Sequence, residues 1–131
     1  MHVYESAEDY LEAILVIQKR RGFVRSIDIA NELSFSKPSV SVAMKKLRES
    51  GYVEMDDAGC LHLLPAGLAI AENIYERHQM LTDFFHFLGV DEETAAKDAC
   101  RVEHDLAPVT FEKLKAHIIQ TMGREPETAE K

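Results

Sequence analysis

The sequence predicts a mainly α-helical protein with an N-terminal winged helix-turn-helix and a C-terminal all-helical domain. Three observations favour this fold class. Within residues 1–64, a short helical segment, a three-residue turn and a second helical segment precede a small β-hairpin pattern. Residues 65–123 contain three apolar patterns with the period of an α-helix. Residues 124–131 are polar and charged, so we expect a frayed tail there.

Two helices are predicted at the start of the N-terminal half. Residues 6–21 carry apolar residues at helical spacing, with Ser6 as the expected N-cap and Gly22 as the expected stop. Ser26 is expected to cap a short second helix, which ends at the polar turn of residues 34–36. The apolar positions of these two helices are Tyr10, Leu11, Ile14, Leu15, Ile17, Ile27, Ile29, Ala30 and Leu33.

A third helix and a hairpin complete this half. Lys37-Pro38-Ser39 is predicted to open the helix, because proline suits a first helical turn, where its missing N–H has no intrahelical partner. Gly51 is expected to end it. Residues 52–55 and 60–64 are β-prone and are joined by a turn at 56–59. The apolar stripe of the third helix is Val40, Ala43, Met44 and Leu47.

Three helices are predicted after Pro65. They cover residues 66–88, 91–107 and 110–122, with Gly89 ending the first and Pro108 breaking the second. The apolar faces of the last three helices favour self-association. In the first and third helices these faces are formed by Ile70, Ile74, Leu81, Phe85, Leu88, Phe111, Leu114, Ile118 and Met122.

Composition excludes several classes of protein. The chain has 131 residues, 46% of them hydrophobic, which is enough to fill a core. Its formal charge of −8 excludes a uniformly basic protein that binds nucleic acid at all times. Two cysteines are too few for a disulfide framework, and no apolar run is long enough to span a bilayer. The first residues do not form a signal peptide, so we expect a cytoplasmic protein.

The third helix carries a local basic patch, although the chain as a whole is acidic. Between Leu33 and Arg48 there are four bases and no acid. Lysines there can bind phosphates, and small hydroxyls near a helix N-terminus can approach base edges. Arg25 and His62 can add backbone contacts. The alternative is a solvated basic face on an ordinary three-helix bundle. The candidate DNA-binding residues are Arg25, Ser36, Lys37, Pro38, Ser39, Ser41, Val42, Lys45, Lys46 and Arg48.

A second group of residues has the chemistry of a metal site. Cys100, Glu103 and His104 follow the i, i+3, i+4 spacing of one helical face. Asp9 and Glu12 form an i, i+3 carboxylate pair on the first helix. The sixth candidate ligand is His78. Such a set suits Mn(II), Fe(II), Co(II), Ni(II) or Zn(II).

Each candidate ligand also has a simpler interpretation. Asp9 can belong to a capping box that starts at Ser6, and Glu12 can be a surface acid. Cys100 can be a small buried hydrophobic residue, and His78 an ordinary core or surface histidine.

The chain resembles the DtxR/MntR family of metal-dependent transcriptional repressors over about residues 4–122. The family implies a homodimer with an N-terminal winged helix and a C-terminal helical dimerisation domain. Divalent metal is expected between the two halves, where it favours the form that binds operator DNA. The chain is similar to the shorter type, which has no SH3-like third domain. The motifs that carry the resemblance are Ser6-Ala-Glu-Asp9-Tyr10-Leu11-Glu12, Asp28-Ile-Ala-x-x-Leu33, Pro38-Ser-Val-Ser41, Lys46-Leu-Arg-Glu-x-Gly51-Tyr52, Arg77-His78 and Asp98-Ala-Cys100-Arg-Val-Glu103-His104.

The resemblance implies a hybrid metal site. The ligands of the manganese-type members match Asp9, Glu12, His78, Glu103 and His104 in this chain. Position 100 departs from that branch, because a cysteine stands where the manganese type has glutamate. The iron type has this cysteine but has methionine where this chain has Asp9. The ancillary site of the longer members also loses two ligands, because Thr82 and Ala96 stand at their positions.

The expected function is a metal-dependent repressor that is not an enzyme. We expect Fe(II) or Mn(II) as the cofactor, with Co(II), Ni(II) or Zn(II) possible in vitro. The expected partners are a palindromic DNA operator, near metal uptake genes, and a second copy of the chain, with no membrane and no organic substrate. One alternative is a metal-independent winged-helix regulator that senses an organic ligand, or oxidation through Cys100. Two weaker alternatives are a small metal-dependent hydrolase and a helical adaptor.

Overall fold

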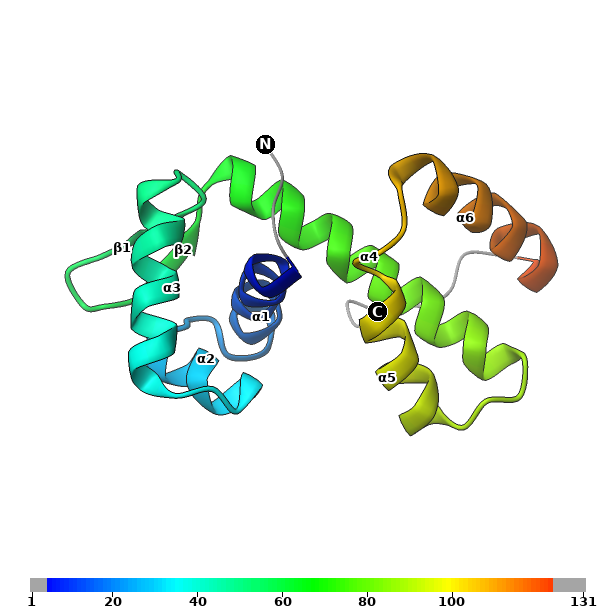
Figure 1. The fold of residues 1–131 in the computed structure, drawn as a ribbon, viewed down its shortest axis with the longest axis horizontal. Coiled ribbons are helices and arrows are strands. Elements are labelled where there is room, and N and C mark those ends of the chain that lie inside the picture. Colours follow the sequence, from blue (N-terminus) through cyan, green and yellow to red (C-terminus); the bar gives the residue numbers. More distant parts are fainter. Residues whose placement is uncertain (1–4, 124–131) are drawn as a thin grey trace. The chain divides into compact units, whose positions relative to one another are not determined.

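The structure is a computed structural model that describes residues 5–123 of the chain (Figure 1). The described residues form six helices and one two-stranded antiparallel sheet, in the order α1-α2-α3-β1-β2-α4-α5-α6. They divide into two compact units, one up to Glu72 and one from Asn73 onwards. The division falls inside α4 (Pro65–Phe87). The boundary that the sequence predicts, between residues 64 and 65, is where α4 begins, and it stays a prediction.

The first unit is a winged helix-turn-helix, which confirms the predicted fold class. Its helices are α1 (Glu5–Arg21), α2 (Ser26–Leu33) and α3 (Lys37–Glu49), and the start of α4 follows. The wing pairs β1 (Val53–Met55) with β2 (Leu61–Leu63). The fully buried side chains of this unit include Leu11, Ile14, Ile17, Val24, Ile29, Met44 and Leu61.

Local chemistry fixes where α3 begins. Ser34 adopts the left-handed conformation with φ of 58°, which turns the chain after α2. The Ser36 side chain then accepts a hydrogen bond from the Ser39 backbone N–H at 3.3 Å. Pro38 sits in the first helical turn, as the sequence predicts.

Two predicted helix caps are wrong. Ser6 already lies inside α1, so it is not the N-cap of that helix. Ser26 is the first residue of α2, and the N-cap is Arg25. The Asp28 carboxylate accepts the Arg25 backbone N–H at 2.9 Å, so an acid at the third helical position satisfies this end of the helix. Ile27 is 39% exposed and lies outside the core.

The second unit contains the rest of α4 with α5 (Glu92–Val102) and α6 (Pro108–Met122). Asp91 caps α5 by accepting the Thr94 backbone N–H at 3.0 Å. The core is a cluster of Met80, Phe111 and Ile118, against which partly buried apolar residues pack. No helix within residues 5–123 is long and apolar enough to cross a membrane. The predicted polar tail at 124–131 lies outside the described residues.

The predicted helix over residues 91–107 is too long. Helix α5 ends at Val102, and Pro108 opens α6 instead of breaking the preceding helix. A local turn bond, from the Asp105 backbone N–H to the Val102 carbonyl at 3.1 Å, and a contact that is distant in sequence both lie at this end. The Arg77 Nη1 group donates to the carbonyls of Glu103 and Leu106, which holds residues 103–106 in a turn.

Gly67 gives a direct test of the packing in the first unit. A Cβ at this position would overlap the Tyr52 carbonyl oxygen, which also accepts the Leu64 backbone N–H at 2.9 Å. We expect Gly67→Ala to lower the free energy of unfolding by about 1–3 kcal/mol, measured by urea denaturation. A decrease in stability would indicate the close approach, because alanine inside a helix otherwise stabilises a protein relative to glycine. A variant that is as stable as the parent, or more so, would contradict the close approach.

Candidate metal centre

Three predicted ligands lie together at the end of α5. The Cys100 sulfur, a Glu103 carboxylate oxygen and a His104 ring nitrogen lie within 4.8 Å of one another. Glu103 is fully buried, and the His104 side chain is 2% exposed. Cys100 is exposed. The cluster therefore has a buried carboxylate and imidazole, with a thiol on its accessible side.

His78 extends this cluster from α4. Its Nδ1 atom lies 3.0 Å from Glu103 Oε2, and its side chain is one quarter exposed. On the other side, His104 Nε2 lies 3.5 Å from Glu103 Oε1. The Glu103 carboxylate thus has one imidazole beside each oxygen. Carboxylate and imidazole groups at such distances can act as ligands to one cation.

The turn after α5 positions these side chains. Cys100 is in the last turn of α5, Glu103 is its C-cap, and His104 follows in the turn. Their spacing in the sequence predicts that all three lie on one helical face. The structure keeps them close, although two of the three lie beyond the helix. The Glu103 backbone N–H still bonds to the Ala99 carbonyl at 2.9 Å, which preserves helical geometry up to that residue.

Sequence reasoning gave Arg77 no role. Arg77 is 5% exposed, and its Nη1 lies 3.0 Å from the Glu103 carbonyl and 2.6 Å from the Leu106 carbonyl. Its guanidinium carbon lies 5.0 Å from the centre of the Phe111 ring. The sequence signal that could have identified Arg77 is its position next to His78 in a motif of the family.

Asp9 and Glu12 belong to the first unit, on α1, where both are half-buried. Burial, and secondly the negative charge of Asp9, raise the pKa of the Tyr10 hydroxyl. The capping-box interpretation of Asp9 is excluded, since Ser6 is not an N-cap. Metal binding by these two carboxylates stays a prediction.

The donor set within the second unit fits a divalent transition metal. It offers one carboxylate, two imidazoles and one thiol, which together span hard to soft ligand character. A buried carboxylate is costly without a compensating charge, and a cation bound there would supply that charge. These residues are therefore chemically suited to hold such an ion.

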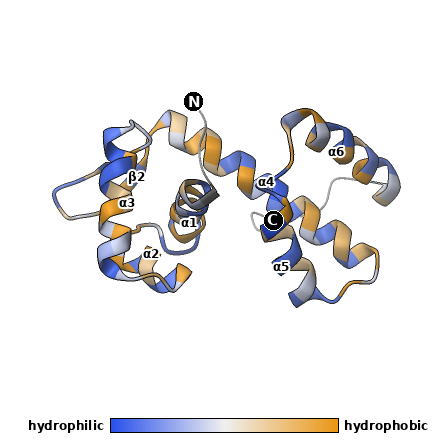
Figure 2. Ribbon diagram, in the orientation of Figure 1, coloured by the Kyte–Doolittle hydropathy of each residue, from blue (hydrophilic) through white to orange (hydrophobic). Residues whose placement is uncertain are grey.

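The candidate DNA-binding residues lie on one side of α3. Val40, Met44 and Leu47 are buried, whereas the residues between them are mostly exposed. Figure 2 shows the resulting alternation of hydrophilic and hydrophobic residues along this helix. Arg25 is also exposed. Contact of these residues with DNA stays a prediction. The exposed candidates on and beside α3 are Ser36, Lys37, Pro38, Ser39, Ser41, Val42, Lys45, Lys46 and Arg48.

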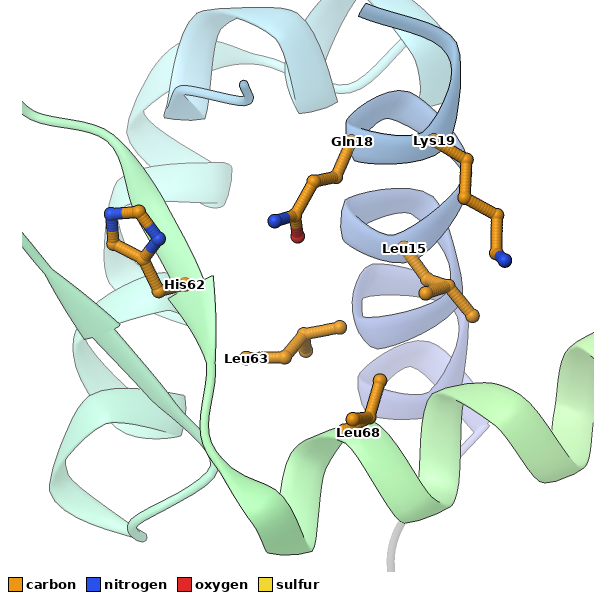
Figure 3. A pocket seen from close by; sticks show the side chains of 6 residues that line it. All are labelled: Leu15, Gln18, Lys19, His62, Leu63 and Leu68. Carbon is orange, nitrogen blue, oxygen red and sulfur yellow. The ribbon is translucent and has the colours of Figure 1, made fainter. Parts of the chain in front are cut away.

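A shallow groove in the first unit is unsuited to a metal. It has a volume of about 440 Å³ and is lined by residues of α1, β2 and α4 (Figure 3). Three of its lining residues are leucines, and His62 is its one residue with a metal-ligating side chain. His62 Nε2 lies 2.9 Å from Asp56 Oδ2, within the wing hairpin. The lining residues are Leu15, Gln18, Lys19, His62, Leu63 and Leu68.

Solved structures share this fold. The protein IdeR of T. acidophilum superposes with a TM-score of 0.76 at 22% identity, covering 96% of this chain and 57% of that one. A manganese-dependent transcriptional repressor in complex with manganese superposes with a TM-score of 0.76 at 27% identity, covering 89% of this chain and 52% of that one. This chain therefore spans slightly more than half the length of these two proteins.

Comparison of sequences identifies the family. The family description "Iron dependent repressor, N-terminal DNA binding domain" matches residues 2–61, and "Iron dependent repressor, metal binding and dimerisation domain" matches residues 64–128. The regulator MntR of Lysinibacillus sphaericus is 32% identical over 126 residues, covering 96% of this chain and 90% of that protein. An uncharacterised HTH-type regulator of Methanocaldococcus jannaschii is 34% identical over 113 residues, covering 85% and 90%. These relatives are transcriptional regulators and not enzymes, as the sequence predicts. The chain belongs to the iron-dependent repressor family, which is the DtxR/MntR family that its motifs resemble.

Proposed function

We propose that this protein is a homodimeric repressor whose binding to operator DNA depends on a divalent metal ion. The observation that carries the proposal is the Glu103 carboxylate, which is buried between the imidazoles of His78 and His104. Cys100 adds a thiol close to two of these donors. The proposed ligands are Asp9, Glu12, His78, Cys100, Glu103 and His104.

The proposed ligands come from both units of the chain. Asp9 and Glu12 lie on α1, and the other four lie in the second unit. Carboxylates repel one another, whereas a bound cation attracts them and forms coordination bonds with them. Ligation by both units would restrict the placement of α1, whereas repulsion among the acids would oppose that placement without a metal.

Restricting α1 also restricts the helix-turn-helix. Arg20 at the end of α1 pairs with Glu32 of α2 at 2.8 Å, and Arg21 pairs with Asp28 at 2.7 Å. These surface ion pairs are weak individually, but the buried face of α1 packs in the same core as α2 and α3. The position of α1 therefore determines the position of the exposed face of α3.

In a dimer this arrangement sets the distance between two α3 helices. Successive major grooves on one face of DNA are roughly 34 Å apart, so a palindromic operator fits a two-fold dimer. Metal binding must then raise the affinity for DNA by the same factor by which DNA binding raises the affinity for metal. We propose that the repressor controls metal uptake genes. We also propose that the protein lies in the cytoplasm, where its operator DNA is.

We propose Mn(II) or Fe(II) as the metal. The carboxylates favour hard ions such as Mn(II), and the Cys100 thiolate shifts the preference towards softer ions. Co(II), Ni(II) and Zn(II) fit the same donors and serve as probes in vitro.

Metal dependence is tested by DNA binding. We expect Mn(II) to raise affinity for a labelled palindromic promoter fragment, and EDTA to abolish the effect, measured by fluorescence anisotropy. Glu103→Ala and Asp9→Ala should each remove most of the response, because each removes a charged ligand. Glu93→Ala is the matched control, since Glu93 is an exposed acid on α5 that pairs with Lys97 at 3.1 Å.

The same assay separates the alternatives. DNA binding that is unchanged by EDTA and by both ligand substitutions contradicts the proposal. Binding that depends on thiol oxidation instead would favour a sensor that works through Cys100. Turnover of phosphoesters with added Mn(II) would favour a hydrolase.

The role of α3 is tested by the salt dependence of binding. We expect Lys45→Ala to weaken metal-loaded binding similarly for all DNA sequences and to reduce the slope of log affinity against log salt by about 1. The reason is the loss of one phosphate contact. Lys97→Ala removes another exposed lysine, from α5, and should leave the slope unchanged. Equal slopes for Lys45→Ala and the parent would exclude this lysine from the interface.

A further inference from the structure

We propose that Arg77 is a positioning residue that sets the affinity of the metal centre by holding the turn that carries Glu103 and His104. This inference rests on the proposed function, because it concerns the same ligands. Arg77 does not itself act as a ligand, since a guanidinium is always protonated and offers no lone pair. Its effect must pass through the backbone to which it is bonded.

The contacts of Arg77 lie at both ends of the turn. One nitrogen, Nη1, donates to the Glu103 carbonyl at 3.0 Å and to the Leu106 carbonyl at 2.6 Å. His104 lies between these two residues in sequence. The end of α5 leaves carbonyl groups without intrahelical partners, and a cation there also interacts favourably with the helix dipole. Removing the guanidinium would release both ends of the turn.

Neighbouring residues of α4 hold Glu103 at two separate points. Arg77 binds its backbone carbonyl, and His78 lies 3.0 Å from its carboxylate through Nδ1. Arg77 and His78 are consecutive residues. The backbone and the carboxylate of Glu103 therefore both contact one short stretch of α4. Partners of this kind, outside the ligand shell, orient ligands and tune metal affinity.

Arg77 is a buried charged residue, so its place in the fold needs an explanation beyond packing. The residue is 5% exposed, and its Nε is buried without a hydrogen-bond partner among the residues that the structure describes. An apolar side chain of similar length could also pack against Phe111 without burying a charge. What the guanidinium provides in addition is the pair of bonds to the turn.

Whether Arg77→Met raises or lowers metal affinity distinguishes a positioning role of Arg77 from a purely electrostatic one. Arg77 places a positive charge close to residues that would hold a cation. If only charge mattered, Arg77→Met would raise metal affinity by removing repulsion. If Arg77 positions Glu103 and His104, the same substitution lowers metal affinity. The two explanations therefore predict opposite results.

The experiment measures Co(II) and Mn(II) binding to the full chain by calorimetry, with visible spectra of the Co(II) form. We expect Arg77→Met to weaken binding by about 10–100-fold and to change the Co(II) spectrum, because ligand geometry is altered. Arg77→Lys keeps the charge and can reach one carbonyl, so it should restore part of the affinity. Lys115→Met is the matched control, because Lys115 is also a cation that links α4 to another element, with its Nζ 2.9 Å from Glu76.

Each outcome bears on the proposal. All variants are measured at a temperature at which circular dichroism shows them folded. Parental affinity and spectrum in Arg77→Met, or tighter binding, would overturn it. If Arg77→Met does not fold, Arg77→Lys decides, and parental binding in that variant overturns the proposal. Equal weakening by Lys115→Met would show a general structural effect and would also overturn it. Failure of the parent protein to bind either metal would instead refute the proposed function.

Discussion

The arrangement of the second unit depends on the burial of one carboxylate. Glu103 is fully buried, and an ionised carboxylate in such a place requires partners. His78 and His104 flank its two oxygens, and Arg77 binds its backbone. The end of α5, the turn that follows and the central part of α4 are therefore arranged around a single side chain. Packing of Met80, Phe111 and Ile118 stabilises the rest of this unit with ordinary apolar contacts.

In the first unit, helix α1 contributes both to the core and to the half-buried surface that carries Asp9 and Glu12. Leu11, Ile14 and Ile17 bury one face of α1 in the core shared by α2 and α3. Asp9 and Glu12 remain half-buried on the same helix. A helix packed in this way moves as one body with its neighbours, because a close-packed core resists sliding. The carboxylates of α1 and the exposed face of α3 are thus parts of one rigid element.

The fold could be predicted from the sequence where local chemistry decides it. Helical periodicity indicated all six helices, and the turn residues before and after α3 marked its ends. The error in the length of α5 involves a distant contact, whereas the two errors in helix caps are local. Helix α5 ends at Val102, before the end of the predicted helix over residues 91–107, and Arg77 binds the turn that follows it. The acid Asp28, and not Ser26, satisfies the start of α2. Spacing identified Glu103 and His104 as candidates, but only the folded chain shows that Arg77 binds the carbonyls of Glu103 and Leu106, on either side of His104.

Differences in burial assign different roles to the donors of the metal centre. Glu103 and His104 are buried, so their positions are fixed by packing and by the turn. His78 is partly exposed, and Cys100 is exposed at the edge of the cluster. Ligands that are fixed in advance set the size and geometry of the site, whereas an exposed ligand can adjust to the ion that enters. The buried carboxylate and imidazole are therefore chemically suited to a hard to borderline divalent ion. Ligation by the exposed Cys100 thiol would shift that preference towards softer ions.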